Sequence, residues 1–400
     1  MHLYVLCGAA GSVFLISIAI AITVVIKCRT KNTYNFRKGK ESKSVQLNEF
    51  GPKSELSALN TTITNINKGN ATFSLEKQFE ELELNDERRK SHYPCTIGLR
   101  YCSKNPSRSL NVDPEVIPYD ATRVVLKTPI KNSDYINATW MNKAAKEGDY
   151  ATPIMTPYVP YSKLNVILTQ DPMPQTMAHY YQMIYDNYVD VVIQICSRDD
   201  FDTKEIHFET QQTILNFDIK TTSANLLTAF LVKRSVEIHN NEQDYKQTYS
   251  LIQFIDWPEM IVEPAVNEDR KKFLSAISLI RKMIGKGKST VNVVVQDNKG
   301  GVGGAAVYVA LLQLMQAVDE SIESANADGE LSSDQLTSLN VFQTVNMMRK
   351  NRAKLVRTFE EYTFMTHCLL EYVQDKAYFD NLVVDDFYAS AVREKSMYFT

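Results

Sequence analysis

The sequence predicts an α/β domain that follows one transmembrane helix. Three short apolar runs are typical of buried strands, and they span residues 189–195, 249–254 and 291–295. Four longer segments repeat apolar side chains at helical intervals, and they span residues 267–284, 306–321, 333–349 and 359–372. The third observation is a run without charged residues near the N-terminus, at residues 3–26.

The uncharged run is long enough to cross a bilayer. A helix over residues 3–26 would be about 36 Å long, and the hydrocarbon core is about 30 Å thick. A cleaved signal peptide is the alternative, but it would have a shorter apolar region behind a positive segment. Here only His2 precedes the run. We therefore predict a transmembrane helix at residues 3–26.

A basic cluster follows this run directly. Its members are Lys27, Arg29, Lys31, Arg37, Lys38, Lys40 and Lys43, with only Glu41 opposing them. Positive flanks stay in the cytosol, so we expect a single-pass protein of the plasma membrane with a cytoplasmic domain. The same basic segment is expected to contact anionic lipid headgroups.

The rest of the chain divides by composition. Residues 27–73 are polar with sparse apolar positions, which predicts a basic, flexible juxtamembrane linker. A helix is expected from residue 74 to residue 84, with Ser74 as its cap. The domain is predicted at residues 74–375 and a C-terminal tail at residues 376–400.

Charge and cysteine usage exclude several function classes. The net charge of −3 gives no basic footprint for nucleic acid. The six cysteines are scattered and form no CxxC pair, and the six histidines show no ligand spacing. We therefore expect no bound metal, no cofactor and no nucleic-acid partner.

Six segments, in order, resemble the protein-tyrosine-phosphatase family. They are Asn111-Val112 with residues 117–126 (IPYDATRVVL), residues 134–138 (DYINA), residues 169–173 (TQDPM) with 180–185 (YYQMIY), Trp257-Pro258-Glu259, residues 293–306, and residues 356–364 (VRTFEEYTF). Each is a weak signal alone, but their order from residue 75 to residue 372 is specific. The resemblance implies a twisted mixed sheet with helices on both faces.

The resemblance also implies a chemistry. Members of this family use a thiolate nucleophile in the motif H-C-S-x-G-x-G-R-T-G, its arginine to bind the phosphoryl oxygens, and an aspartate as general acid. Counting back from the following helix aligns Asn298 with the cysteine and Gly304 with the arginine. Counting forward from the preceding strand aligns Asp297 with the cysteine. Neither Asn298 nor Asp297 carries a thiol, and no arginine occurs between Lys282 and Met348.

Three other positions depart from the family pattern. Glu259 stands where the general-acid aspartate is expected, and Glu361 stands at the second glutamine of the water-positioning loop. Ser109 replaces the tyrosine that stacks on phosphotyrosine. These degenerate positions resemble the inactive second domains of receptor phosphatases, so we predict a pseudophosphatase with no catalytic residues. Asp120, by contrast, matches the family pattern and is expected to support the fold.

The expected function is a binding and regulatory scaffold in phosphotyrosine signalling, with an active receptor phosphatase or a phosphotyrosine protein as partner. A possible anion- or partner-binding loop contains Lys299, Gly300, Gly301, Val302, Gly303 and Gly304. A phosphotyrosine-trapping receptor is the first alternative, and an active phosphatase is a weaker one. A nucleotide P-loop is a similarly weak alternative, because Gly304 and Ala305 stand where its lysine and hydroxyl belong.

Overall fold

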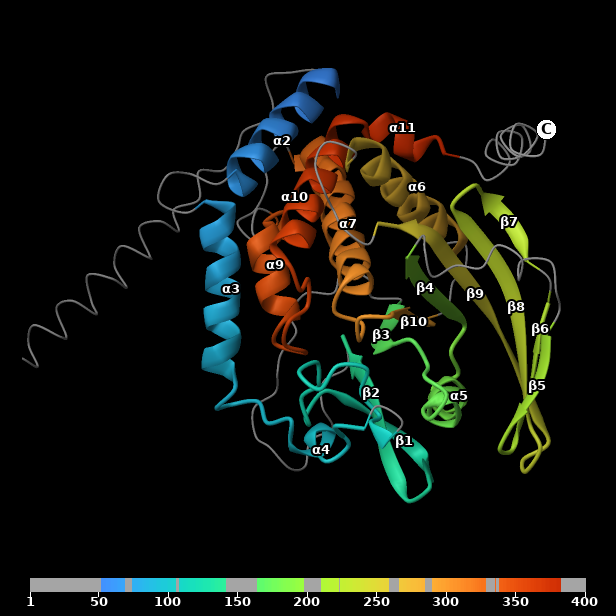
Figure 1. The fold of residues 1–400 in the computed structure, drawn as a ribbon. Coiled ribbons are helices and arrows are strands. Elements are labelled where there is room, and N and C mark those ends of the chain that lie inside the picture. Colours follow the sequence, from blue (N-terminus) through green and yellow to red (C-terminus); the bar gives the residue numbers. More distant parts are fainter. Residues whose placement is uncertain are drawn as a thin grey trace, which may run out of the picture.

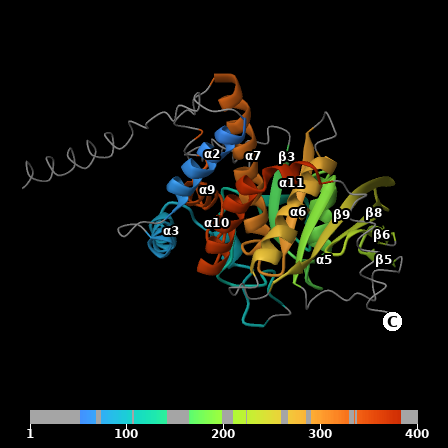
Figure 2. The same cartoon turned by 90° about the horizontal axis from the view of Figure 1, so that it is seen from above.

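The computed structural model describes most of the chain between residues 52 and 382. The described ranges are 52–68, 74–105, 108–141, 164–197, 210–222, 224–258, 266–284, 290–328, 335 and 338–382. They form a twisted mixed sheet with helices on both faces (Figures 1 and 2). This is the architecture that the sequence predicts.

The described residues contain a ten-stranded sheet with the spatial order β1-β2-β3-β10-β4-β9-β8-β6-β5, and β7 pairs with β8. The strands are β1 (Arg123–Ile130), β2 (Ser133–Trp140), β3 (Leu164–Gln170), β4 (Val191–Ser197), β5 (Thr210–Ile214), β6 (Phe217–Thr221), β7 (Asn225–Thr228), β8 (Leu231–Asn240), β9 (Tyr245–Trp257) and β10 (Val291–Asp297). The central strands β3, β10, β4 and β9 are parallel, and the outer pairs are antiparallel.

Helices cover the two faces unequally. They are α2 (Pro52–Asn67), α3 (Leu75–Arg89), α4 (Thr96–Leu99), α5 (Met177–Asp186), α6 (Val266–Ile284), α7 (Gly304–Asp328), α9 (Val341–Met348), α10 (Phe359–Gln374) and α11 (Lys376–Asp380). The larger core contains residues of α6, α7 and α10, while α5 supplies the helical part of the second core. Figure 2 shows the packed helices α7, α10 and α6 beside the sheet.

Strand β10 contributes to both cores because its side chains alternate between the two faces. Val293 and Val295 are buried in the larger core, and Val294 is buried in the core of α5. Parallel neighbours on both sides complete the backbone hydrogen bonding of this apolar strand. The strand therefore fixes its last residue, Asp297, at the centre of the molecule.

Several helix ends follow their local sequence signals. The Ser74 hydroxyl accepts a hydrogen bond from the Lys77 N–H, so the predicted cap of α3 is confirmed. Thr358 and Glu361 form a reciprocal capping box at the start of α10. The expected helix at residues 333–349 is shorter among the described residues, where α9 begins at Val341 behind the cap Asn340.

The prediction of a flexible linker at residues 27–73 is wrong for the part of that range that forms α2. Leu59 and Ile63 of this helix are buried in the larger core. The Asn67 side chain donates to the Leu339 carbonyl at 2.9 Å and accepts from the Val341 N–H at 2.8 Å. Residues 59, 63 and 67 are spaced by four, so they share one helical face, and this single narrow stripe was hidden among polar residues.

The predicted boundary between domain and tail at residue 375 also differs from the structure. Helix α11 continues the packing, because Phe379 is buried and its ring lies 5.5 Å from that of Tyr372. Lys282 donates to the carbonyls of Phe379 and Leu382. The ordered domain therefore extends to at least residue 382.

No helix in the part of the chain that the structure describes is long and apolar enough to span a membrane. The predicted transmembrane helix at residues 3–26 and the basic cluster that follows it lie outside the described residues.

Candidate functional site

The β10–α7 loop (residues 298–303) connects the central strand to the start of α7. Asp297 ends β10, and α7 begins at Gly304. Gly300 to Gly304 are buried, whereas Asn298 is exposed and Lys299 is half-buried. Most of the loop that the sequence marks as a possible anion- or partner-binding element is therefore covered by neighbouring residues.

The Asp297 carboxylate lies inside this loop and is held by four backbone N–H groups. Its Oδ1 accepts from Lys299 at 2.9 Å and from Gly301 at 2.6 Å. Its Oδ2 accepts from Gly303 at 3.1 Å and from Ala305 at 3.0 Å. Each carboxylate oxygen thus has two donors, and the side chain is only 2% exposed.

Burial raises the pKa of Asp297 above its usual value, while the backbone donors and the charge of Arg352 oppose that rise. All four of its hydrogen-bond partners are N–H groups, which bind a carboxylate better than a carboxylic acid. The loop therefore surrounds an internal anion. A carboxylate at this position repels a phosphate by its charge, and Asp297 also occupies the four N–H donors of the loop.

The residues that the two counts align with the family motif lie on the two sides of the loop. Asp297 at the end of β10 fits the count from the strand, and Gly304 at the start of α7 fits the count from the helix. The two positions are seven apart, whereas the family motif separates its cysteine and arginine by six. A loop that satisfied both counts would be one residue longer than the family motif, and Asn298 is exposed at its surface.

Two glycines give the loop its shape. Gly300 has φ of +87° and Gly301 has φ of +76°, a region that side chains disfavour. A Cβ on Gly301 would lie 2.7 Å from the Thr169 carbonyl oxygen, so the loop backbone packs directly on the end of β3. This close approach turns the N–H of Gly301 toward Asp297.

The position aligned with the family arginine has no room for a side chain. A Cβ on Gly304 would lie 2.8 Å from Cγ2 of Ile195 and 2.9 Å from Cε2 of Trp257. The Trp257 ring packs against two other aromatic rings: its centroid lies 4.9 Å from that of Phe273 and 5.6 Å from that of Phe364. Trp257 is therefore part of the core, and it closes the space above the start of α7.

A buried arginine supports the loop from beneath. Nη2 of Arg352 donates to the Gly300 carbonyl at 2.7 Å and to Oδ1 of Asn137 at 2.5 Å, and Nη1 donates to the Thr139 hydroxyl at 3.2 Å. Burial lowers the pKa of Arg352 to about 10, and the charge of Asp297 opposes this change. Sequence reasoning missed this residue because it searched for an arginine inside the loop motif. The run of basic residues just ahead of α10 was the sequence signal that could have identified Arg352.

The side chain of Glu361, on α10, also lies next to the β10–α7 loop. Its Oε2 accepts from the N–H groups of Arg357 at 2.9 Å and Thr358 at 3.3 Å. Its Oε1 lies 3.0 Å from the point where a Cβ on Gly303 would be, and the Lys299 side chain lies at 3.1 Å from that point. Burial raises the pKa of Glu361 to about 7, with Lys299 lowering it and Asp297 raising it.

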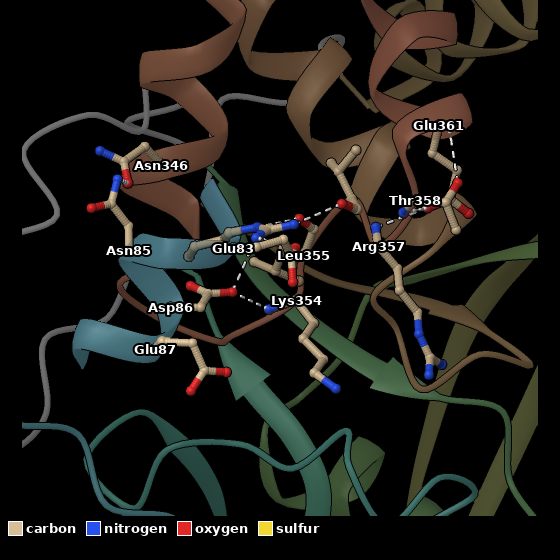
Figure 3. A network of polar contacts seen from close by, with 12 residues as sticks. Glu83, Asn85, Asp86, Glu87, Asn346, Lys354, Leu355, Arg357, Thr358 and Glu361 are labelled. Carbon is tan, nitrogen blue, oxygen red and sulfur yellow. Dashed lines mark hydrogen bonds and ion pairs between the residues drawn. The ribbon is translucent and has the colours of Figure 1, made fainter. Parts of the chain in front are cut away.

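Segment 349–357 carries Arg352 and leads into α10, and it is fixed by an ionic network (Figure 3). Arg349 is fully buried and pairs with Glu83 at 2.7 Å and Asp86 at 3.1 Å, both on α3. It also donates to the Leu355 carbonyl at 2.9 Å. Helix α3 thus holds the segment that positions Arg352 under the β10–α7 loop.

Ser109 forms a turn and is not open to a ligand. The residue is 5% exposed, and its hydroxyl donates to the Asn111 carbonyl at 2.8 Å. Its own carbonyl accepts from the Gln175 side chain at 2.9 Å. Glu259, the position aligned with the general acid, lies outside the described residues, although Trp257 and Pro258 before it are described.

The sequence-predicted residues therefore divide into two groups. Asp297, Lys299, Gly303 and Glu361 meet in one place. The Ser109 hydroxyl instead donates to the Asn111 carbonyl, and Asn298 is exposed. The expected structural role of Asp120 is confirmed, because it accepts from the N–H groups of Thr96 and Ile97 at the start of α4.

Comparisons with known proteins agree with this fold. The family model of protein-tyrosine phosphatase matches residues 107–371. Tyrosine-protein phosphatase non-receptor type 20 of Rattus norvegicus is 25% identical over 309 residues, which cover 74% of this chain and 60% of the relative. Receptor-type tyrosine-protein phosphatase S of Gallus gallus is 23% identical over 319 residues, which cover 78% of this chain and 18% of the relative. The chain thus spans only part of these relatives.

A solved structure gives the same result for the fold. The catalytic domain of human protein tyrosine phosphatase non-receptor type 18 superposes with a TM-score of 0.54 at 20% identity, covering 75% of this chain and 96% of that domain. The family model matches well over half of the sequence. The chain belongs to the protein-tyrosine phosphatase family.

Proposed function

We propose that this chain is a catalytically inactive member of its family, a pseudophosphatase that acts as a binding and regulatory scaffold in phosphotyrosine signalling. One observation carries the proposal. The residue at the end of β10, where the family places its thiolate, is an aspartate whose two oxygens each accept two backbone hydrogen bonds. The N–H groups that would bind a phosphoryl group are already paired.

Carboxylates can act as nucleophiles in phosphoryl transfer, so Asp297 itself needs consideration. An attacking oxygen needs a free lone pair that faces the substrate. Asp297 is 2% exposed, and its oxygens face the loop backbone. No thiol occurs between Cys196 and Cys368 in the sequence to replace it. These facts argue against turnover by the family mechanism.

The alternative of a phosphotyrosine-trapping receptor is less well supported. Trapping needs free N–H donors and a bidentate cation. The donors contact Asp297, and a side chain at Gly304 would meet Ile195 and Trp257. A nucleotide-binding loop needs the same donors and a lysine at Gly304, so the same contacts argue against it.

Membrane anchoring and the partner are part of the proposal. The uncharged run at residues 3–26 with its basic flank favours a single-pass protein of the plasma membrane with a cytoplasmic domain and contact with anionic lipid. The receptor-type relative favours a membrane setting as well. An active receptor phosphatase or a phosphotyrosine protein is the proposed partner.

An activity assay tests the central claim. The full chain and its Asp297→Ala variant are incubated with a phosphotyrosine peptide, and released phosphate is measured. We expect no release from either protein above a blank without protein. Turnover by the native chain that disappears in the variant would overturn the proposal, because it would identify Asp297 as a catalytic residue.

A further inference from the structure

The four N–H groups around Asp297 form a compact oxyanion site. They come from alternate residues of the turn, namely Lys299, Gly301, Gly303 and Ala305, and all four point to one carboxyl group. The positive end of α7 adds to their field, since α7 begins at Gly304. Backbone donors arranged in this way bind a negative group with two or more oxygens.

The surrounding residues keep the site formed and closed. Arg352 holds the Gly300 carbonyl from below. Gly301 packs against the backbone of Thr169 with no space for a Cβ. Both residues are buried, so the loop conformation is set by its neighbours as well as by Asp297. Removing the carboxylate alone should therefore leave the donors close to their present positions.

We propose that the β10–α7 loop is an oxyanion site whose resident ligand is the chain's own Asp297 carboxylate. The native chain then has no free site for a phosphate monoester at this place, and a partner that docks here is recognised independently of its phosphorylation. This inference rests on the proposed scaffold function and specifies the ligand class of the same site: a planar carboxylate held internally, in place of a tetrahedral phosphate brought by a substrate.

Chemical rescue tests the proposal. In Asp297→Ala the missing group corresponds to formate, which is small and planar and carries two oxygens. Thermal unfolding of the full chain is measured in formate, in inorganic phosphate and in chloride at equal ionic strength and pH. Asn298→Ala is the matched control. Asn298 is adjacent to Asp297 and exposed, and it is the residue that the count from the helix aligns with the family cysteine.

We expect Asp297→Ala to unfold at a lower temperature than the native chain in chloride. Formate at about ten times its Kd should then raise the midpoint of the variant by about 2–4 °C. The native chain and Asn298→Ala should respond to neither anion. A response of Asp297→Ala to phosphate would also support the proposal, since it would show that the vacated donors accept oxyanions.

Two results would overturn the proposal. One is a folded Asp297→Ala variant that responds to no anion, which would show that the donors do not form a site. The other is a native chain that phosphate stabilises as much as it stabilises the variant, which would show that free donors remain. The proposed lack of activity would survive either result, because it is measured separately as phosphate release.

A second measurement applies if Asp297→Ala fails to fold. In the native chain, the backbone N–H resonances of Lys299, Gly301, Gly303 and Ala305 are followed while inorganic phosphate is added. Because their acceptor is Asp297, we expect these four resonances to stay in place and their hydrogens to exchange slowly. Movement of the four resonances on phosphate addition would refute the internal ligand.

Discussion

The indole ring of Trp257 lies in the space that a side chain on Gly304 would need. Cε2 of Trp257 is 2.9 Å from the position of a Cβ on Gly304, a separation that real contacts do not show. Because Trp257 packs on Phe273 and Phe364, it cannot move aside without opening the larger core. The tryptophan and the glycine are therefore mutually dependent, and this dependence can be measured.

Gly304→Ala should destabilise the fold although alanine favours helices. Because Gly304 is the first residue of α7, the helix propensity gain is smaller than the value of about 1 kcal/mol for a helix interior. The overpacking cost is about 1–3 kcal/mol, and contact with Ile195 as well as Trp257 places it at the upper end. Urea unfolding measures the net loss. Trp257→Leu combined with Gly304→Ala should lose less than the sum of the single changes. Strict additivity would contradict the dependence of the two residues.

Arg352→Met should cost about 3–5 kcal/mol of unfolding free energy. The change leaves the Gly300 carbonyl and Asn137 without their donor and leaves the buried Asp297 without a nearby cation. Arg357→Met is the matched control, because Arg357 pairs with Asp113 at a partly exposed site and should cost about 1 kcal/mol or less. Equal losses for the two variants would show that Arg352 does not support the loop.

Glu361→Gln should stabilise the chain in a pH-dependent way. Burial raises the folded-state pKa of Glu361 from 4.5 to about 7, so the folded chain binds this proton more tightly than the unfolded chain does. The favourable contribution of Glu361 is therefore complete below pH 4.5 and is lost as the pH rises through about 7.

Glutamine stays uncharged over this range, so the advantage of Glu361→Gln should grow between these pH values to about 3 kcal/mol, at about 1.4 kcal/mol for each pKa unit. Urea unfolding at pH 5 and at pH 8 measures it. Glu360→Gln, on the exposed side of α10, is the control and should differ from the native chain by less than about 0.5 kcal/mol at both pH values. An advantage that is equal at the two pH values would be inconsistent with a buried, titrating Glu361.

Helix α2 should be required for full stability. Ile63→Ala removes a side chain with no exposure and should cost about 2–4 kcal/mol. Asn65→Ala, on the exposed side of the same helix, should change stability by less than about 0.5 kcal/mol. Thermal unfolding of the two variants decides this, and similar midpoints would mean that α2 is not part of the folded unit.

The sequence predicted the fold well because its signals were local and repeated. The apolar run at residues 291–295 and the periodicity of residues 359–372 depend on neighbours in the chain, and both became the expected elements β10 and α10. Helix α2 was missed because its buried residues Leu59 and Ile63 stand among polar residues, and the helices that α2 contacts, α10 and α7, lie far along the sequence.

The site was predicted only in part for the same reason. Counting along the chain pointed to Asp297 and Gly304 but could not choose between two registers, because these residues are seven apart and the family motif separates its cysteine and arginine by six. Arg352 was not identified, since its link to Gly300 joins residues 52 positions apart. The direction of the Asp297 carboxylate depends on backbone N–H orientation, which no residue pattern encodes.

The length of the β10–α7 loop also bears on the reversibility of the proposed inactive state. Asp297 and Gly304 are seven residues apart, so a cysteine at position 297 and an arginine at position 304 would lie one residue farther apart than in the family motif. Under the proposed function, a gain of the family chemistry would need a deletion that disturbs the backbone of Gly300 and Gly301, together with repacking of Trp257 away from α7. Each of these changes alone would destabilise the fold, so a stepwise mutational route from the proposed scaffold to an enzyme is unfavourable.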